Sequence, residues 1–280
     1  MTEKGLAPGV AIYRWGKQDG IWMMGETSAS GSFSVIHMDS TEKGDTRGRL
    51  VNADSPWCIE INNNVFIQFN ATADGEYLPL PQKHVDMGMG FERVCGISGT
   101  TDGFTRFGEL PSNYNSDLFT DLFAVLERMS GHRYGARIPD SRENPGEAAM
   151  RDTAFRVIAD HMRCLCCAIA DGILPGNEGR NYVIRRILRR AVLWSDRMGL
   201  GKGVLHEMVE PVVSILGPVF PELKEQRDTI RKVVIAEESA FNRTLDRGMQ
   251  LLEKVMREHP DRIPGEEAFT LYDTYGFPLD

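Results

Sequence analysis

One stretch decides the sheet of this protein: Trp57-Cys58-Ile59-Glu60-Ile61-Asn62-Asn63-Asn64-Val65-Phe66-Ile67-Gln68-Phe69-Asn70. Its odd-numbered positions are apolar except Asn63, which is the alternation expected of a strand with one buried face. Three consecutive asparagines are poor strand formers, so a β-bulge is expected among them. A shorter strand is predicted at 35–38, and Asp74-Gly75 predicts a turn.

The patterns on either side of about residue 105 differ. Residues 1–105 favour strands and loops, with a flexible segment at 25–32 and an extended link at 79–81, whereas residues 106–280 favour helices. Apolar residues at three- and four-residue spacing predict the helices, and Ser116 or Asp117 and Asp152 or Thr153 are the expected N-caps of the first two. The predicted helices cover 117–129, 153–171, 181–198 and 223–258. The predicted fold class is therefore α+β, a sheet followed by a helical domain.

The composition is that of a globular protein. The chain has 280 residues, 41% hydrophobic and 26% charged, which excludes a disordered chain, a collagen and a disulfide-rich mini-protein. The 32 basic and 40 acidic residues give a net charge of -8, which on first reading argues against a nucleic-acid binder. However, residues 151–202 contain 10 basic and 5 acidic residues, so this segment alone carries +5.

The five cysteines are a poor disulfide framework, because their number is odd and three of them lie in Cys164-Leu165-Cys166-Cys167. No second cysteine pair follows at zinc-finger spacing, so we expect buried helix thiols and no zinc site. No apolar run approaches the roughly 20 residues of a membrane-spanning helix, and the first residues lack a signal-peptide pattern. The expected compartment is a reducing cytoplasm without membrane attachment.

The stretch His84-Val85-Asp86-Met87-Gly88-Met89-Gly90-Phe91-Glu92-Arg93 combines a carboxylate, two glycines and an arginine. It predicts a strand that ends near Asp86 and turns into a helix bearing Arg93. The glycines would let a ligand approach the backbone. Asp86 could then hold an ammonium group, and the fork of Arg93 could hold a phosphate. The alternative interpretation is a structural turn with a surface pair of Glu92 and Arg93.

Two further stretches suggest contacts with a nucleic acid. The segment 174–190 contains five arginines within eleven residues, a pattern that matches backbone phosphates. The alternative interpretation is a solvated helix face. Acidic residues are nearly absent from twelve residues of this segment, which argues against that alternative. In Leu271-Tyr272-Asp273-Thr274-Tyr275, Asp273 could accept a hydrogen bond from a base amino group, although alone the stretch indicates only a helix end.

From about residue 22 to 280 these stretches resemble the alanine–tRNA ligases, a family of class II aminoacyl-tRNA synthetases; residues 80–93, 155–190, 240–252 and 268–279 are the most specific. The resemblance implies that residues 86–93 are the third class II motif. Arg93, with Gly90, would contact the phosphates of ATP. Asp86, with the backbone at Gly88, would hold the α-ammonium of alanine, and the pocket would be completed by Trp22 and Asn63.

The resemblance also implies a tRNA partner. Asn177 and Asp273 match the pair that, in the family, contacts the wobble G·U pair of the tRNA acceptor stem. The helix that would support this stem carries Arg180, Arg185, Arg186, Arg189 and Arg190. Residues 1–105 would then be a partial aminoacylation core that contains the C-terminal part of the antiparallel class II sheet. Residues 106–280 would be a helical domain that recognises the acceptor stem of tRNA-Ala. The implied substrates are alanine and ATP, the latter with Mg²⁺.

The chain departs from the family pattern at the small-molecule site. Asn62-Asn63-Asn64 stands in place of Trp-Asn-Leu, and residues 28–35, Ser-Ala-Ser-Gly-Ser-Phe-Ser-Val, replace Gly-Pro-Cys-Gly-Pro-Cys-Ser-Glu. Glu26 and Met87 replace an aspartate and a threonine. We find no match to the first two class II motifs, nor to the editing and C-terminal domains. Three hypotheses follow: a partial alanine–tRNA ligase that is not competent alone, a non-catalytic paralogue that binds acceptor stems, or one half of a split ligase completed by a separate chain.

Overall fold

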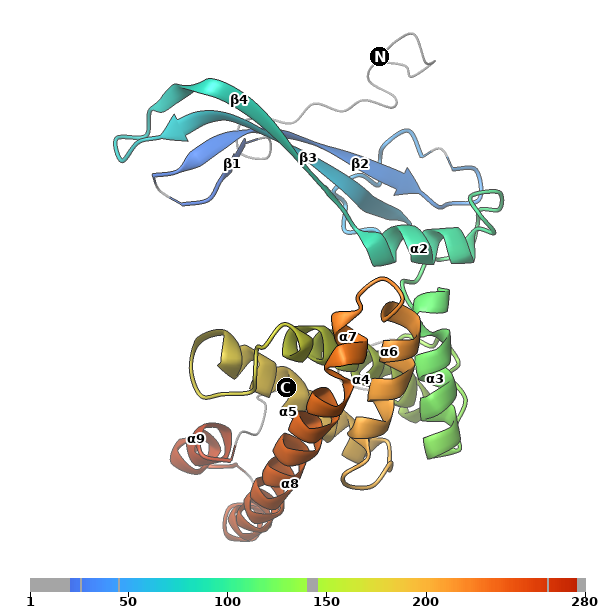
Figure 1. Cartoon of the computed structure of the whole chain (residues 1–280), viewed down its shortest axis with the longest axis vertical. Helices are drawn as coiled ribbons and strands as arrows, with labels where there is room; N and C mark the ends of the chain where they lie inside the picture. Colours follow the sequence, from blue (N-terminus) through green and yellow to red (C-terminus); the bar gives the residue numbers. More distant parts are fainter. Residues whose placement is uncertain (1–20, 26, 45, 140–145, 261, 276–280) are drawn as a thin grey trace. The chain divides into compact units, whose positions relative to one another are not determined.

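The computed structural model describes residues 21–25, 27–44, 46–139, 146–260 and 262–275 (Figure 1). The chain divides into two compact units, Met1–Leu118 and Phe119–Asp280. We call them the sheet unit and the helical unit and treat each by itself. The division falls after the position 105/106 at which the sequence pattern changes, because residues 106–118 group with the sheet.

The sheet unit is built on an antiparallel sheet with strand order β1-β2-β3-β4 (Figure 1). The predicted principal strand is confirmed as β3, which pairs with both β2 and β4. The segment 25–32 is not wholly flexible, because Ser30 is buried and the second half of the segment pairs with β1 and β3. The elements are β1 (Ile21–Met23), β2 (Ala29–Asp39), β3 (Cys58–Ala71), β4 (Tyr77–Met89) and the helix α2 (Phe91–Thr100).

The three asparagines of β3 do not form the expected bulge. Asn62, Asn63 and Asn64 pair in register with both neighbouring strands, and the nearest shift skips Ile61. Side-chain hydrogen bonds compensate for their poor strand propensity: Asn62 Nδ2 donates to Asn64 Oδ1 (3.0 Å), and Asn64 Nδ2 donates to the Ser34 hydroxyl (3.3 Å). The sheet therefore runs unbroken through this polar stretch.

The edge strand β4 is longer than the sequence predicts. It contains Pro79 and Pro81, so the expected link at 79–81 is part of a strand, and it continues to Met89. Asp86 therefore lies inside β4 and not at its end. Proline is tolerated here because an edge strand does not need every N–H for pairing, and a register shift falls in the same region.

The helical unit contains most of the helices. The predicted start of the second helix at Asp152 or Thr153 is wrong. Asp152 is buried, and its carboxylate accepts hydrogen bonds from the N–H groups of Gly135 (2.9 Å) and Arg137 (2.7 Å), so it fixes the preceding loop. The helices are α3 (Asp117–Ser130), α4 (Glu147–Ala170), α5 (Gly179–Arg197), η2 (Leu205–Met208), α6 (Val209–Leu216), α7 (Glu222–Glu225), α8 (Arg227–Glu258) and α9 (Gly265–Asp273).

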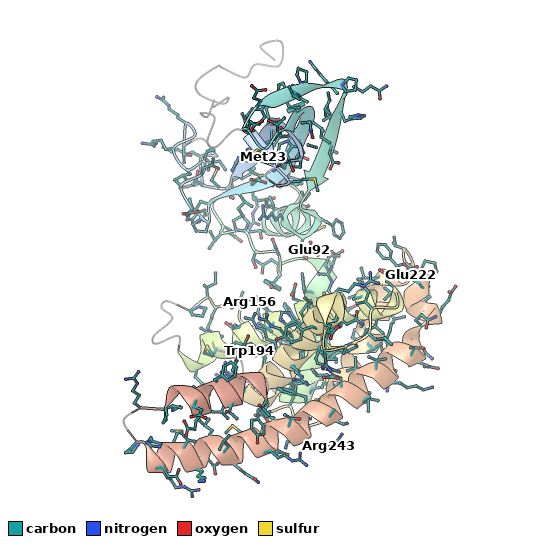
Figure 2. All side chains as sticks on the ribbon, turned by 90° about the vertical axis from the view of Figure 1, so that its left-hand side faces the viewer. Met23, Glu92, Arg156, Trp194, Glu222 and Arg243 are labelled. Carbon is teal, nitrogen blue, oxygen red and sulfur yellow. The ribbon has the colours of Figure 1, made fainter. Side chains whose placement is uncertain are left out.

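The core of the helical unit is formed where α4 packs against α5, α6 and α8. Phe155 is fully buried and lies edge-on to Phe123, with ring centroids 5.9 Å apart, while the tilted ring of Tyr134 lies 4.3 Å from that of Phe123. Figure 2 shows Trp194 on α5 and Arg243 on α8 among the side chains of this unit. Within the described residues, no helix has the length and apolar character needed to cross a membrane.

Candidate functional site

One face of the sheet carries the residues predicted to hold alanine. In the register of β3 and β4, Asn63 lies opposite Gly88 and Val65 lies opposite Asp86. Side chains directly across an antiparallel pair share a face, and so do residues two apart on one strand. Asn63, Asp86 and Gly88 are therefore brought together on one face, with Asn63 and Asp86 as diagonal neighbours about 7 Å apart.

The polar groups on this face leave hydrogen-bonding capacity for a ligand. The Oδ1 atom of Asn63 is buried and has no hydrogen-bond partner among the described residues. Asp86 is exposed, and its Oδ1 accepts a hydrogen bond from the N–H of Met87 (2.9 Å). A buried acceptor beside a carboxylate is complementary to a cationic donor, because an unmet buried acceptor costs about 1–3 kcal/mol.

Trp22 lies on β1, at the opposite end of the strand order from β4. It pairs with Gly31 across β1 and β2, and its indole Nε1 donates to the carbonyl of Phe66 in β3 (3.2 Å). Because β2 lies between β1 and β3, the indole crosses β2. The backbones are close at Gly31, where a Cβ atom would lie 1.8 Å from the Phe66 oxygen. Glycine at this position therefore permits the arrangement.

Arg93 stands at the start of α2, just after the sheet. The N–H of Gly90 donates to the carbonyl of Ile61 (3.1 Å), which ties the strand end to β3. The guanidinium of Arg93 is exposed, and its Nη1 donates to the carbonyl of Glu60 (2.8 Å). A guanidinium has five N–H donors, so this contact orients Arg93 and leaves donors for an anion.

The arginines of α5 divide into two groups, which the sequence pattern does not distinguish. Arg185 and Arg189 are half-buried and form ion pairs with Glu237 of α8, with Nε–Oε1 distances of 3.1 and 3.3 Å. Arg189 also lies over the ring of Phe241, 5.0 Å from its centroid. These two arginines therefore join α5 to α8.

The second group lies on the exposed side of α5. Its predicted members are Arg180, Arg186 and Arg190, all exposed. Aromatic side chains interleave with them: Arg186 lies 6.0 Å from the ring centroid of Tyr182, and Arg197 lies 5.1 Å from that of Trp194. We call the set Tyr182, Arg186, Arg190, Trp194 and Arg197 the arginine–aromatic stripe. Its spacing of three, four and seven residues is the sequence signal that could have added the aromatic members.

The loop before α5 holds Asn177 at the surface. The Oδ1 atom of Asn177 accepts a hydrogen bond from Nη1 of Arg185. The N–H of Gly176 donates to the carbonyl of Asn181 (3.0 Å), which fixes the loop on the first turn of α5. Asp273, the other residue predicted to contact the acceptor stem, is the last residue of α9, and its side chain lies outside the described residues.

With this geometry in view, the comparisons with known proteins are decisive. A family model described as tRNA synthetases class II (A) matches residues 2–280. The chain belongs to this family. It is 50% identical to the alanine–tRNA ligase of Opitutus terrae over 304 aligned residues, which cover 99% of this chain and 32% of that protein. The corresponding protein of Akkermansia muciniphila is 50% identical over 281 residues (99% of this chain, 30% of the relative), and that of Methylacidiphilum infernorum is 47% identical over 280 (98% and 30%).

The resemblance to alanine–tRNA ligases drawn from the sequence is thus confirmed. The chain spans about a third of the length of the curated relatives it matches. An antiparallel sheet followed by helices fits the α+β fold of the class II tRNA synthetases (A).

The cysteines of this class II chain form no ligand cluster. All five are free, Cys166 is fully buried, and burial raises its thiol pKa far above the ordinary value of 9.0. Partial desolvation, together with the negative charge of Asp160, likewise raises the pKa of the Cys164 thiol. Among the described residues no group of three histidine, cysteine, aspartate or glutamate side chains is arranged to hold a metal ion.

Proposed function

We propose that this chain is part of an alanine–tRNA ligase, which attaches alanine to tRNA-Ala at the expense of ATP. The observation that carries the proposal is the shared face of β3 and β4, where a buried, unpaired Asn63 acceptor lies diagonally from the Asp86 carboxylate. Identity of about 50% to alanine–tRNA ligases along the chain supports the choice of substrate.

In this proposal the α-ammonium of alanine donates hydrogen bonds to Asp86 and Asn63. Gly88 lies opposite Asn63 and presents no side chain, so the backbone of β4 can be approached there. The indole of Trp22, hydrogen-bonded to Phe66, forms a wall against the small side chain. These contacts hold the carboxylate of alanine in place while it attacks the α-phosphate of ATP, which forms alanyl-adenylate and releases pyrophosphate.

Arg93 is proposed to contact the phosphates of ATP, with the backbone at Gly90 beside it. Its contact with the Glu60 carbonyl sets the direction of the guanidinium before ATP arrives. Mg²⁺ enters as part of the ATP substrate and neutralises phosphate charge.

The helical unit is proposed to bind the acceptor stem of tRNA-Ala. The arginine–aromatic stripe would meet backbone phosphates, with Arg180 at the start of the same helix, while Asn177 and Asp273 would contact the wobble G·U pair. Arg185 and Arg189 would support the stem indirectly, by holding α5 on α8. The terminal ribose hydroxyl of the tRNA then accepts the alanyl group. The cytoplasm, where five free thiols persist, is the proposed compartment.

A second candidate is a non-catalytic acceptor-stem binder. The departures from the family pattern at residues 28–35 and 62–64 favour it, because they gather at the alanine pocket and leave α5 unaffected. A third is one half of a split ligase, completed by a separate chain. The second and third candidates differ in one respect: only a split ligase would regain catalytic activity when the partner chain is added.

Alanine-dependent exchange of pyrophosphate with ATP tests the catalytic proposal. We expect the purified chain alone to show no exchange above background, since it spans about a third of its relatives. Recovery of exchange when a second chain is added, one that carries the rest of the relatives' sequence, would support a ligase. Asp86→Asn should then abolish the recovered exchange. Clear pyrophosphate exchange by the chain alone would contradict the expectation that this chain is inactive by itself. Binding of tRNA-Ala without recovered exchange would favour the second candidate.

A further inference from the structure

A continuous set of polar contacts runs from α8 to the loop before α5. Glu237 of α8 is mostly buried, with 11% of its side chain exposed, and Arg185 retains 21% exposure. The Nε atom of Arg185 lies 3.1 Å from Oε1 of Glu237. Through its other arm, Nη1, the same guanidinium donates to the side chain of the exposed Asn177.

This contact fixes which way the carboxamide of Asn177 points. A guanidinium has donors and no acceptor, so the atom of Asn177 that faces Arg185 must be the oxygen. The Nδ2 group, with two donors, is then left for other partners. Among the described residues it makes no hydrogen bond, although the residue is exposed.

The backbone of the loop is held as well. Gly176 donates to the carbonyl of Asn181, and a Cβ atom at Gly176 would lie 2.7 Å from the Cβ of Asn181. The loop is therefore packed closely on the first turn of α5. Asn177 is fixed through its neighbour's backbone on one side and through Arg185 on the other.

We propose that Arg185 is a positioning residue which, anchored by Glu237, holds the Asn177 carboxamide so that its two N–H donors face the RNA. This inference rests on the proposed function of the helical unit. The donors suit acceptors in the shallow groove of an RNA stem, such as base carbonyls and 2′-hydroxyls. Arg185 acts through Asn177 and touches no RNA itself, which separates its role from that of the arginine–aromatic stripe.

Arg189 provides a matched control. It lies four residues further along α5, shares Glu237 as its partner, and has 26% exposure against 21% for Arg185, but its side chain contacts Glu237 and Phe241 instead of the loop before α5. Arg185→Lys and Arg189→Lys therefore remove the same chemistry at the same helix interface. A lysine at 185 cannot reach both Glu237 and Asn177, because its single ammonium lacks the guanidinium fork.

The first measurement needs no RNA. Nuclear relaxation of the ¹⁵N-labelled Asn177 side-chain amide in the full chain should show it as rigid as the backbone in the wild type and in Arg189→Lys, but mobile in Arg185→Lys. A mobile amide in the wild type, or a rigid one in Arg185→Lys, would overturn the proposal. Melting temperatures of the two variants monitor any loss of fold, and the wild-type measurement stands without either.

The second measurement uses two RNA hairpins that carry the acceptor stem of tRNA-Ala with either its G·U pair or a G·C pair. We expect Arg185→Lys to reduce the ratio of the two affinities about fivefold, the size of one hydrogen bond, and Arg189→Lys to leave the ratio unchanged. Equal ratios in both variants would refute the positioning role. Failure of the wild type to bind either hairpin would instead remove the tRNA function, while the amide relaxation would still report on Arg185.

Discussion

The sheet unit and the helical unit differ in how much apolar surface they bury. Of the described residues in the sheet unit, the buried apolar side chains are Ala71, Ile97 and Leu118, whereas the helical unit buries a large set around Phe155 and Leu165. Strand β4 is largely exposed on both faces, and the exposed fractions of Val85, Met87 and Met89 are 66%, 63% and 56%.

This difference indicates which unit is stabilised more by apolar burial. Burial contributes roughly 25 cal/mol per Å² of apolar surface, so the helical unit has its own source of stability. The sheet unit presents the Asp86 carboxylate on the exposed strand β4. Removal of a buried side chain from the helical core should therefore lower stability strongly, whereas removal of an exposed apolar side chain from strand β4 should change it little.

The largest expected effect comes from Phe155→Ala in the helical core. The ring is fully buried against Phe123 and Tyr134, so its removal should lower the free energy of unfolding by about 3–5 kcal/mol. Urea unfolding followed by circular dichroism measures this. Val85→Ala in the sheet unit is the control and should change stability by less than about 0.5 kcal/mol. Equal losses of unfolding free energy in the two variants would contradict the proposed difference between the units.

A smaller effect is expected from the surface of α5. The double variant Arg186→Ala and Arg190→Ala should weaken tRNA binding and reduce the slope of log affinity against log salt by about two, one unit for each phosphate that is no longer neutralised. Filter binding at several salt concentrations gives this slope. Arg243→Ala with Arg257→Ala changes the charge equally on the exposed side of α8, and it should leave the slope nearly unchanged. An unchanged slope for the α5 variant would refute the stripe as the phosphate-binding surface.

The smallest effects are opposite pH dependences in the two units. Burial alone would raise the pKa of Asp39 in β2, but hydrogen bonds from Thr41 and Thr46 outweigh it and hold the pKa below 3.8. Burial raises the pKa of Glu238 in α8 above 4.5, despite hydrogen bonds from the N–H groups of residues 203–205. Asp39 therefore contributes stability above its unfolded pKa, which is lost as pH falls, whereas the contribution of Glu238 is present at low pH and is lost as pH rises.

Melting temperatures of Asp39→Asn and Glu238→Gln test these signs. Relative to the wild type, Asp39→Asn should be more destabilising at about pH 6 than at about pH 3, and Glu238→Gln should be less destabilising at about pH 6 than at about pH 4. If both variants shift in the same direction with pH, the assigned causes are wrong for one of them.

Much of the fold could be predicted from the sequence because its signals are local. Alternation along 57–70 predicted the central strand, and helical spacing predicted α3, α5 and most of α8 to within a few residues. The predictions that were wrong concern residues whose structure depends on contacts distant in sequence. Asp152 looks like a helix cap, yet it binds a loop 15 to 17 residues away, and residues 29–32 look flexible until β1 and β3 pair with them.

For the candidate site, the sequence identified residues but not how the fold arranges them. Resemblance selected Asn63, Asp86 and Gly88, and only the strand register places them on one face. The run of arginines predicted an RNA-binding helix. However, Arg185 and Arg189 form ion pairs with Glu237, which belongs to a helix about 50 residues later in the chain. Spacing alone could not have separated these two from Arg186 and Arg190.

The close approach at Gly31 bears on how this sequence has diverged. Compared with the family pattern, residues 28–35 have exchanged both prolines, both cysteines, the first glycine and the final glutamate, and have kept Gly31 and Ser34. At Gly31 a methyl group would overlap the carbonyl of Phe66, and Ser34 accepts a hydrogen bond from Asn64. A side chain at position 31 would therefore require the backbones of β2 and β3 to move apart, so the geometry of the sheet by itself accounts for glycine at this position.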